Sequence, residues 1–116
     1  MSKSIVNDKS FEFVIRIVKL YKYLMEDKKE CVFSKQILRN GINIDANINE
    51  LLQGQRKKNF LMKKDIAFKE YLETKYWIKL LCATDYTNQE QEDSIFKGCI
   101  EFEKMLTSIV KNRVTV

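Results

Sequence analysis

The chain of 116 residues contains no histidine, and this absence excludes several classes of chemistry. Without histidine there can be no Ser-His-Asp triad, no Cys-His nucleophile pair and no His-ligated zinc site. A di-iron four-helix bundle, which needs a Glu-x-x-His motif on two helices, is disfavoured for the same reason. We therefore expect a protein that is not an enzyme, with no catalytic residues, no metal and no cofactor.

Proline is also absent, although average usage would give about six residues in a chain of this length. Because proline breaks helix interiors, its absence favours long helices. No segment alternates apolar and polar residues for long, so no strand is predicted. A chain of this size is one domain, and it can bury enough surface to hold a core without disulfides. The sequence therefore predicts a single all-α domain over residues 1–116.

Cysteines are few, and their number is odd. Cys31, Cys82 and Cys99 lack metal-binding spacing and lie beside apolar residues, so we expect buried reduced thiols, as in a reducing cytoplasm. No run of 18 apolar residues is present, and no signal-peptide core follows the polar start MSKSIVNDKS. These features predict a cytoplasmic protein without a membrane span.

Capping residues and apolar periodicity predict four helices, at about residues 10–27, 31–54, 58–84 and 88–112. Ser10 is the expected N-cap of the first helix, and Gly54 is expected to end the second. Either Thr87 or Asn88 is expected to cap the fourth. Four helices joined by short loops form an up-down-up-down antiparallel bundle.

Mostly apolar residues at heptad-type spacings of three, four or seven mark the core face of the later helices. These residues are Ile37, Gly41, Ile44, Ile48 and Leu51, then Phe60, Ala67, Tyr71, Thr74, Ile78 and Leu81, then Ile95, Cys99, Phe102, Leu106 and Ile109. An interior glycine costs about 1 kcal/mol relative to alanine, so Gly41 predicts a close approach by another helix. The first and third helices carry more apolar surface than one core can cover, which predicts self-association.

Three asparagines, Asn40, Asn43 and Asn47, lie on or beside the seam of the second helix. Asparagine forms helices poorly, so three together indicate a buried polar cluster, the alternative being a solvated flank. Antiparallel pairing about a turn near residue 56 brings together residues whose numbers sum to about 113. Asn40 should then face Glu73, and Asn43 should face Glu70. We expect at least one direct Asn–Glu hydrogen bond, which would fix the register of the two helices.

Positive charge is concentrated in one segment. Residues 1–55 hold 9 basic and 7 acidic groups (+2), residues 56–79 hold 8 and 3 (+5), and residues 80–116 hold 4 and 6 (−2). The basic residues of the middle segment are Arg56, Lys57, Lys58, Lys63, Lys64, Lys69, Lys75 and Lys79. Such a stripe can neutralise phosphates without sequence preference, although many charge runs are only solvated helix faces. We expect RNA or DNA to contact Arg56, Lys57, Lys58, Lys63 and Lys64.

Aromatic residues follow in the same predicted helix, as Tyr71, Tyr76 and Trp77. They could stack on bases, but their helical spacing favours a place in the core or in a subunit interface.

Several segments in order resemble those of the four-helix bundle proteins encoded by intervening sequences in bacterial 23S ribosomal RNA genes. They are SFEFVIRIVKLYKYL (10–24), SKQILRNG (34–41), Ala46-Asn47-Ile48 with Glu50, Asn59-Phe60, Ile66-Ala67, KEYLETKYWIKLL (69–81) and MLTSIVK (105–111). The chain departs from the family pattern at residues 42–45 and at Asn49, Leu51 and Leu52, where the family has small or acidic residues.

The resemblance implies a homopentameric barrel of four-helix bundles with no established enzymatic activity and no agreed catalytic residues. A related group serves as accessory proteins of diversity-generating retroelements, in which a basic pentamer associates with nucleic acid and a reverse transcriptase. The expected partners are therefore other copies of the chain, RNA or DNA, and a protein such as a reverse transcriptase. The alternative function is a protein–protein scaffold without direct nucleic-acid contact.

Overall fold

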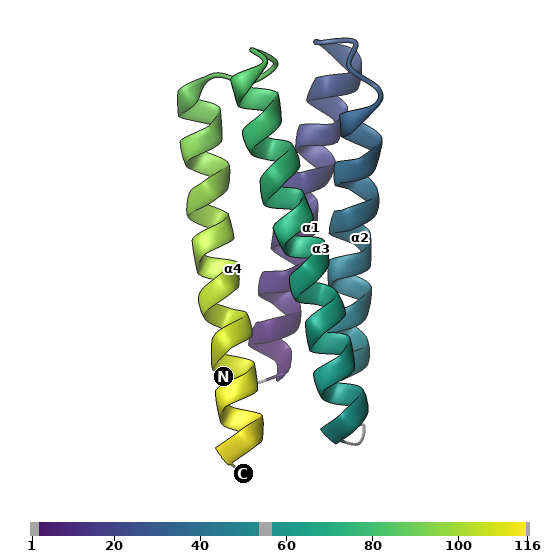
Figure 1. The fold of residues 1–116 in the computed structure, drawn as a ribbon, viewed down its shortest axis with the longest axis vertical. Coiled ribbons are helices and arrows are strands. Elements are labelled where there is room, and N and C mark those ends of the chain that lie inside the picture. Colours follow the sequence, from purple (N-terminus) through teal and green to yellow (C-terminus); the bar gives the residue numbers. More distant parts are fainter. Residues whose placement is uncertain (1–2, 54–56, 116) are drawn as a thin grey trace.

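The computed structural model describes residues 3–53 and 57–115, with side chains from 5 to 53 and from 59 to 109. Within these residues the chain forms four α-helices and no strand: α1 (Lys3–Glu26), α2 (Phe33–Leu51), α3 (Lys57–Ala83) and α4 (Gln89–Thr115) (Figure 1). The helices form an elongated bundle of 46 × 21 × 20 Å. The predicted all-α four-helix bundle is confirmed.

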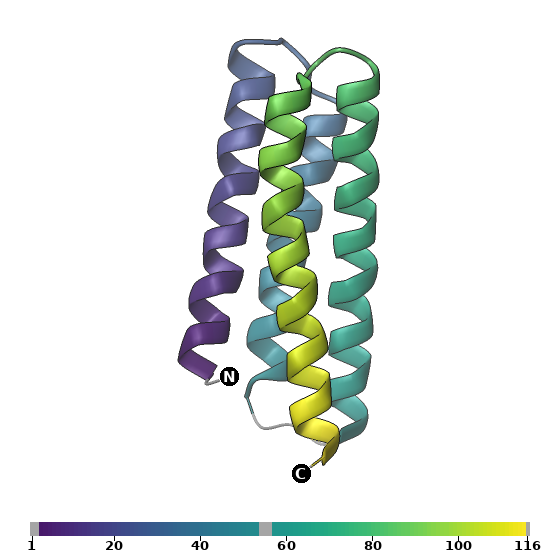
Figure 2. The same ribbon diagram turned by 90° about the vertical axis from the view of Figure 1, so that its left-hand side faces the viewer.

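Consecutive helices run in opposite directions, and each packs against its neighbours in the chain, with α4 closing against α1. The turned view places α1 and α3 on opposite sides of α4, with α2 behind (Figure 2). The α1–α2 and α3–α4 connections lie at one end of the bundle, and the two chain ends lie at the other. No helix in the described part of the chain combines the length and hydropathy needed to cross a membrane.

Helix α1 begins at Lys3, well before the predicted N-cap Ser10. The prediction of the cap is wrong because Ser10 is buried inside the helix, where its hydroxyl donates to Asp45 Oδ1 of α2 at 2.6 Å. Val6 is buried one turn earlier and extends the core stripe of Phe13 and Ile17. The residues before Ser10 include neither proline nor glycine, so nothing stops the helix from extending over them.

Helix α2 is shorter than predicted, since it begins at Phe33 instead of Cys31 and ends at Leu51, while Gly54 lies outside the described residues. Its N-terminus is capped by the buried carboxylate of Glu30. That carboxylate accepts three hydrogen bonds of 2.8–2.9 Å, from the backbone N–H groups of Val32, Phe33 and Ser34. An acidic group there satisfies unpaired donors and favours the positive end of the helix dipole.

Removing this cap should destabilise the bundle. We expect Glu30→Ala to lower the free energy of unfolding by about 1–2 kcal/mol, the usual range for loss of a helix cap. Urea denaturation followed by circular dichroism would measure the change. Glu26→Ala is the matched control, because Glu26 is an exposed acidic residue at the end of α1. Equal stability of the two variants would contradict the capping role.

Helices α3 and α4 lie close to their predicted bounds. Of the two candidate caps of α4, Asn88 is correct, since its Oδ1 accepts from the Gln91 backbone N–H at 2.8 Å. The Gln91 side chain accepts from the Asn88 backbone N–H at 2.9 Å, which completes a reciprocal capping box. Thr87 lies buried just before it.

The predicted seams of α2, α3 and α4 form the core, with all their residues buried except Ile95, which is half-buried. At Gly41, a Cβ atom would lie 2.8 Å from Cγ2 of Ile17, so α1 makes the predicted close approach there. Cys99 is buried, and this burial raises the pKa of its thiol to about 11. Cys82 is only half-buried, and Cys31 is exposed in the connection before α2, so the expectation that all three thiols are buried is wrong.

Candidate nucleic-acid interface

The structure describes only part of the predicted phosphate-binding set. Arg56 lies outside the described residues, and Lys57 and Lys58 begin α3 with side chains that are likewise not described. Lys63 and Lys64 are half-buried, and each lies beside a carboxylate. The Lys63 Nζ atom is 2.5 Å from Glu50 of α2, and the Lys64 Nζ atom is 3.4 Å from its neighbour Asp65. Ion pairs at the protein surface contribute about 0–1 kcal/mol, so a phosphate can compete for both lysines.

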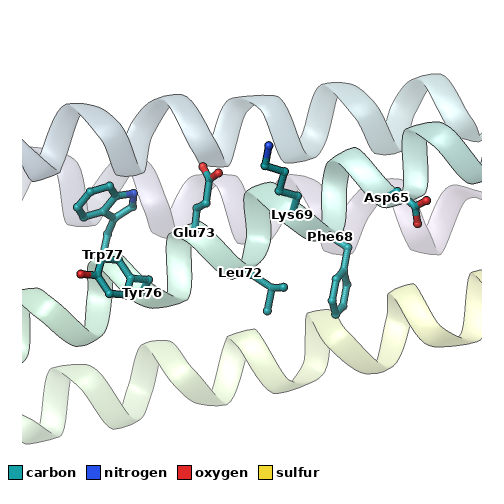
Figure 3. A pocket seen from close by; sticks show the side chains of 7 residues that line it. All are labelled: Asp65, Phe68, Lys69, Leu72, Glu73, Tyr76 and Trp77. Atoms are coloured by element: carbon teal, nitrogen blue, oxygen red, sulfur yellow. The ribbon is translucent and has the colours of Figure 1, made fainter.

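Two of the three acidic residues in the basic segment contact the neighbouring helix α2 and keep their negative charge there. Glu70 and Glu73 both accept hydrogen bonds from Asn40 of α2. In the close view, Glu73 points to the α2 side of α3, whereas Phe68 and Leu72 point toward α4 (Figure 3). Lys69 and Lys79 are exposed on the same helix. Residues 59–79 hold five lysines and three carboxylates, so this part of α3 keeps a positive excess.

The predicted polar cluster centres on one residue. Asn40 is fully buried, and its amide nitrogen donates to Glu70 and, at 2.7 Å, to Glu73. The second expected pair, Asn43 with Glu70, is wrong, because Glu70 accepts its hydrogen bond from Asn40. Asn47 donates to the Asn43 carbonyl at 2.7 Å within α2. One amide therefore links α2 to two successive turns of α3.

The chemistry of this cluster is that of a structural link. The amide supplies two N–H donors, and each carboxylate accepts one of them. Among the residues that the structure describes, the Asn40 Oδ1 atom is buried without a hydrogen-bond partner. Within the same residues, no group of three or more acidic, cysteine or histidine side chains could hold a metal ion.

The three α3 aromatic residues considered for base stacking, Tyr71, Tyr76 and Trp77, have different environments. Tyr71 lies in the core, where its hydroxyl donates to the Cys99 carbonyl at 3.1 Å and burial raises its pKa well above the ordinary value. Trp77 is half-buried and stacks on Phe33 of α2, with ring centroids 5.6 Å apart. Tyr76 is 60% exposed, which the core interpretation did not anticipate.

A surface groove of about 420 Å³ lies between α3 and α4. Its lining residues are Leu72, Lys75, Tyr76, Lys79, Phe96, Cys99 and Ile100. A second, shallower hollow on α3 shares Leu72 and Tyr76 with this groove and adds Asp65, Phe68, Lys69, Glu73 and Trp77 (Figure 3). The sequence indicated the basic and apolar residues of α3, but not which of them border α4.

A contact between α1 and α4 also had no signal in the sequence. The Arg16 guanidinium donates to the Ser94 carbonyl at 2.8 Å and to its hydroxyl at 3.0 Å. It also passes over Gly98, where a Cβ atom would lie 2.6 Å from the Arg16 Nη1 atom. Helical periodicity places Arg16 on a polar face but cannot show that this face borders α4.

Comparison with known proteins finds matches over nearly the whole chain. The model of a family described as 23S rRNA-intervening sequence protein matches residues 2–108. A crystal structure from Bacteroides thetaiotaomicron, of a protein with unknown function from the S23 ribosomal protein family, superposes with a TM-score of 0.90. The two sequences are 50% identical, over 96% of this chain and 99% of that chain. No curated protein matches the sequence.

Proposed function

Because the chain belongs to the 23S rRNA-intervening sequence protein family, we propose that it is a non-enzymatic, oligomeric four-helix bundle that binds RNA or DNA through the basic surface of α3. The observation that carries the proposal is the charge distribution. Residues 56–79 hold 8 basic and 3 acidic groups, a net charge of +5, which equals the net charge of the entire chain. Lysine and arginine concentrated on one helix are the usual electrostatic footprint of phosphate binding.

The fold strengthens this charge argument. Lys63 and Lys64 sit in weak surface ion pairs, in which a phosphate can replace the carboxylate. Binding to phosphates releases condensed counterions and carries no base information. The protein should therefore bind nucleic acids of many sequences, with an affinity that falls as salt rises.

Three further features support the remaining parts of the proposal. Exposed apolar side chains on α1 and α3, such as Phe11 and Met62, favour self-association, and the family resemblance favours a pentamer. The absence of histidine favours a role without catalysis. Cys31, Cys82 and Cys99 are free thiols, the state that the reducing cytoplasm maintains.

The experiment for nucleic-acid binding is a salt titration of a variant with four substitutions, Lys57→Gln, Lys58→Gln, Lys63→Gln and Lys64→Gln. Wild-type affinity for a mixed-sequence RNA should fall steeply with salt, and the variant should bind every sequence more weakly. Since each lost phosphate contact lowers the slope of log affinity against log salt by about 0.7–0.9, four contacts should lower it by about 3. Fluorescence anisotropy measures both quantities.

The matched control has four exposed lysines replaced elsewhere, at Lys19, Lys22, Lys29 and Lys35, with the same change in net charge. If both variants lose affinity equally, net charge alone governs binding and the α3 surface is not the site. If the wild-type protein does not bind at low salt, the alternative function is favoured. That alternative is a scaffold for a protein partner, such as a reverse transcriptase, and it is supported by the exposed apolar residues Leu72, Tyr76 and Ile100.

A further inference from the structure

Basic and apolar residues alternate along the side of α3 that borders α4. Lys64, Phe68, Leu72 and Tyr76 follow one another at intervals of four, so successive members stack along one face of the helix. Lys75 and Lys79 lie beside Tyr76 in the groove between the two helices. We call these six residues the α3 strip: Lys64, Phe68, Leu72, Lys75, Tyr76 and Lys79.

The part of the strip at the groove combines an accessible aromatic ring with unbalanced positive charge. Tyr76 is 60% exposed, and Ile100 on the facing wall is 52% exposed. The groove is lined by two lysines, Lys75 and Lys79, and by no acidic residue. Lys79 is exposed, so its ammonium group is available to an anion. An occupant that complements this groove needs flat apolar surface and negative charge within a few ångströms of each other.

We propose that the α3 strip binds single-stranded nucleic acid, with a base stacked on Tyr76 and flanking phosphates held by Lys75 and Lys79. A single strand presents both required features, because its bases are unpaired and its phosphates follow at every nucleotide. In a duplex the faces of the bases are stacked on one another, so Tyr76 would have no base to receive. This inference rests on the proposed function and names the form of nucleic acid that it concerns.

The dimensions and the neighbouring contacts agree with this assignment. From Lys64 to Lys79 the helix rises about 22 Å, which is enough for a strand of a few nucleotides. The Lys64 Nζ atom lies 5.8 Å from the centre of the Phe68 ring, and the Lys75 Nζ atom lies 5.8 Å from that of the core residue Tyr71, so a lysine lies near an aromatic ring at both ends of the strip. Base–aromatic stacking tolerates any base, as does phosphate binding. The strip therefore predicts binding without sequence preference.

A second copy of the chain fits the groove less well through its exposed α1 face. Ile17 packs against Gly41, and the adjacent Asn40 bonds to Glu70 and Glu73, so Ile17 of α1 is level with residues near 72 of α3. Lys19 and Lys22 then lie at the height of Lys75. A neighbouring bundle set level and parallel would bring its α1 lysines against those of the groove, and like charges repel.

The test uses Tyr76→Ser, Tyr76→Phe and, as a matched control, Ile42→Ser, which removes a similarly exposed apolar side chain (50%) from α2. We expect Tyr76→Ser to weaken binding of a labelled mixed-sequence single-stranded DNA of 12 nucleotides by about 5- to 150-fold, the range for loss of one stacked base. Tyr76→Phe keeps the ring and should bind like the wild type, as should Ile42→Ser. Affinity for the duplex of the same sequence should hardly change in any variant.

Tryptophan fluorescence provides a second measurement. Trp77 is the only tryptophan, and its ring centre lies 5.3 Å from that of Tyr76. A base arriving on Tyr76 should change the Trp77 fluorescence of the unlabelled wild-type protein, and a duplex should change it much less. Circular dichroism and thermal melting check that the Tyr76 variants are folded.

Each outcome separates this inference from the proposed function. If single strands bind in a salt-dependent manner but Tyr76→Ser loses no affinity, the strip is not the site and the proposed function stands. If Tyr76→Ser dissociates the oligomer and leaves nucleic-acid affinity unchanged, the groove is an interface between copies and the inference is overturned. If neither single strand nor duplex binds at low salt, the proposed function fails and the inference fails with it.

Discussion

Replacing Asn40 with aspartate should destabilise the bundle by about 3–5 kcal/mol, the cost of an uncompensated buried charge. The substitution hardly changes the shape of the side chain, but it replaces the amide that donates to both Glu70 and Glu73 with an acceptor. Three carboxylates would then meet where Asn40 is fully buried. Urea denaturation at neutral pH would measure the loss.

Two measurements make the interpretation specific. The loss of stability in Asn40→Asp should shrink as pH is lowered, because protonating one carboxyl group recreates an O–H donor in the cluster. Asn43→Asp is the control one turn away on α2, where the amide link to the two glutamates is absent, and it should cost about 0.5 kcal/mol or less. A variant Asn40→Asp with the stability of the wild type would show that the Asn40 amide does not hold the two carboxylates.

Asn40→Leu should be milder than Asn40→Asp. Leucine also leaves Glu70 and Glu73 without their donor, and an unpaired buried acceptor costs about 1–3 kcal/mol. It removes, however, the Asn40 oxygen that is buried without a partner, and it adds no charge. Both glutamates are only half-buried, so water can partly replace the amide. We therefore expect Asn40→Asp to be the least stable protein and Asn40→Leu to lie between it and the wild type. This order would separate repulsion between charges from simple loss of a hydrogen bond.

The Asn40 link was predictable because it depends on two regular quantities. Helical rise fixes the height of a residue along α2, and antiparallel pairing about a short turn transfers that height to α3. The prediction found Asn40 and Glu73 but also paired Asn43 with Glu70, whereas the structure gives both carboxylates to Asn40. Height along the helix axis alone cannot decide which asparagine bonds to the two glutamates. Rotation about the helix axis and the side-chain rotamer determine which amide reaches α3.

The same reasoning explains the predictions that were wrong. Ser10 has the residue type of an N-cap, but its hydroxyl is used by Asp45, a residue 35 positions away that only the fold brings close. Glu30 caps α2 from before the helix, which local propensity rules do not cover well. Periodicity assigns residues to faces, and it therefore recovered the core. It does not show which faces border which helix, so the groove containing Tyr76 and Lys79 became visible only in the structure.

Gly41→Val should destabilise the bundle by about 2–3 kcal/mol, near the upper end of the range for overpacking a core. The added Cβ alone would lie 2.8 Å from Cγ2 of Ile17 and 3.2 Å from its Cβ, and valine adds two more methyl groups. Ile17 is buried and branched at Cβ, so it has few rotamers with which to retreat. Because valine forms helices little better than glycine does, propensity offsets the clash by only about 0.4 kcal/mol.

Gly98→Val is the matched control, because the new side chain would meet the end of a flexible arginine there and not a buried isoleucine. At Gly98 the nearest atom is Nη1 at the flexible end of Arg16, an exposed side chain that can move into solvent. The cost there should be about 0.5–1 kcal/mol, from the lost hydrogen bonds to Ser94. A comparable loss at both sites would mean that the close approach of α1 to α2 does not set the requirement for glycine.

A double substitution tests the contact between Gly41 and Ile17 directly. Ile17→Ala alone should cost about 2–5 kcal/mol through the cavity it leaves. Combined with Gly41→Val, the new methyl groups occupy part of that cavity, so the double variant should be more stable than the sum of the two single losses. We expect a coupling free energy of about 1–3 kcal/mol in the double-mutant cycle. Strict additivity would show that the two side chains do not share this space and that α1 and α2 are held apart by other residues.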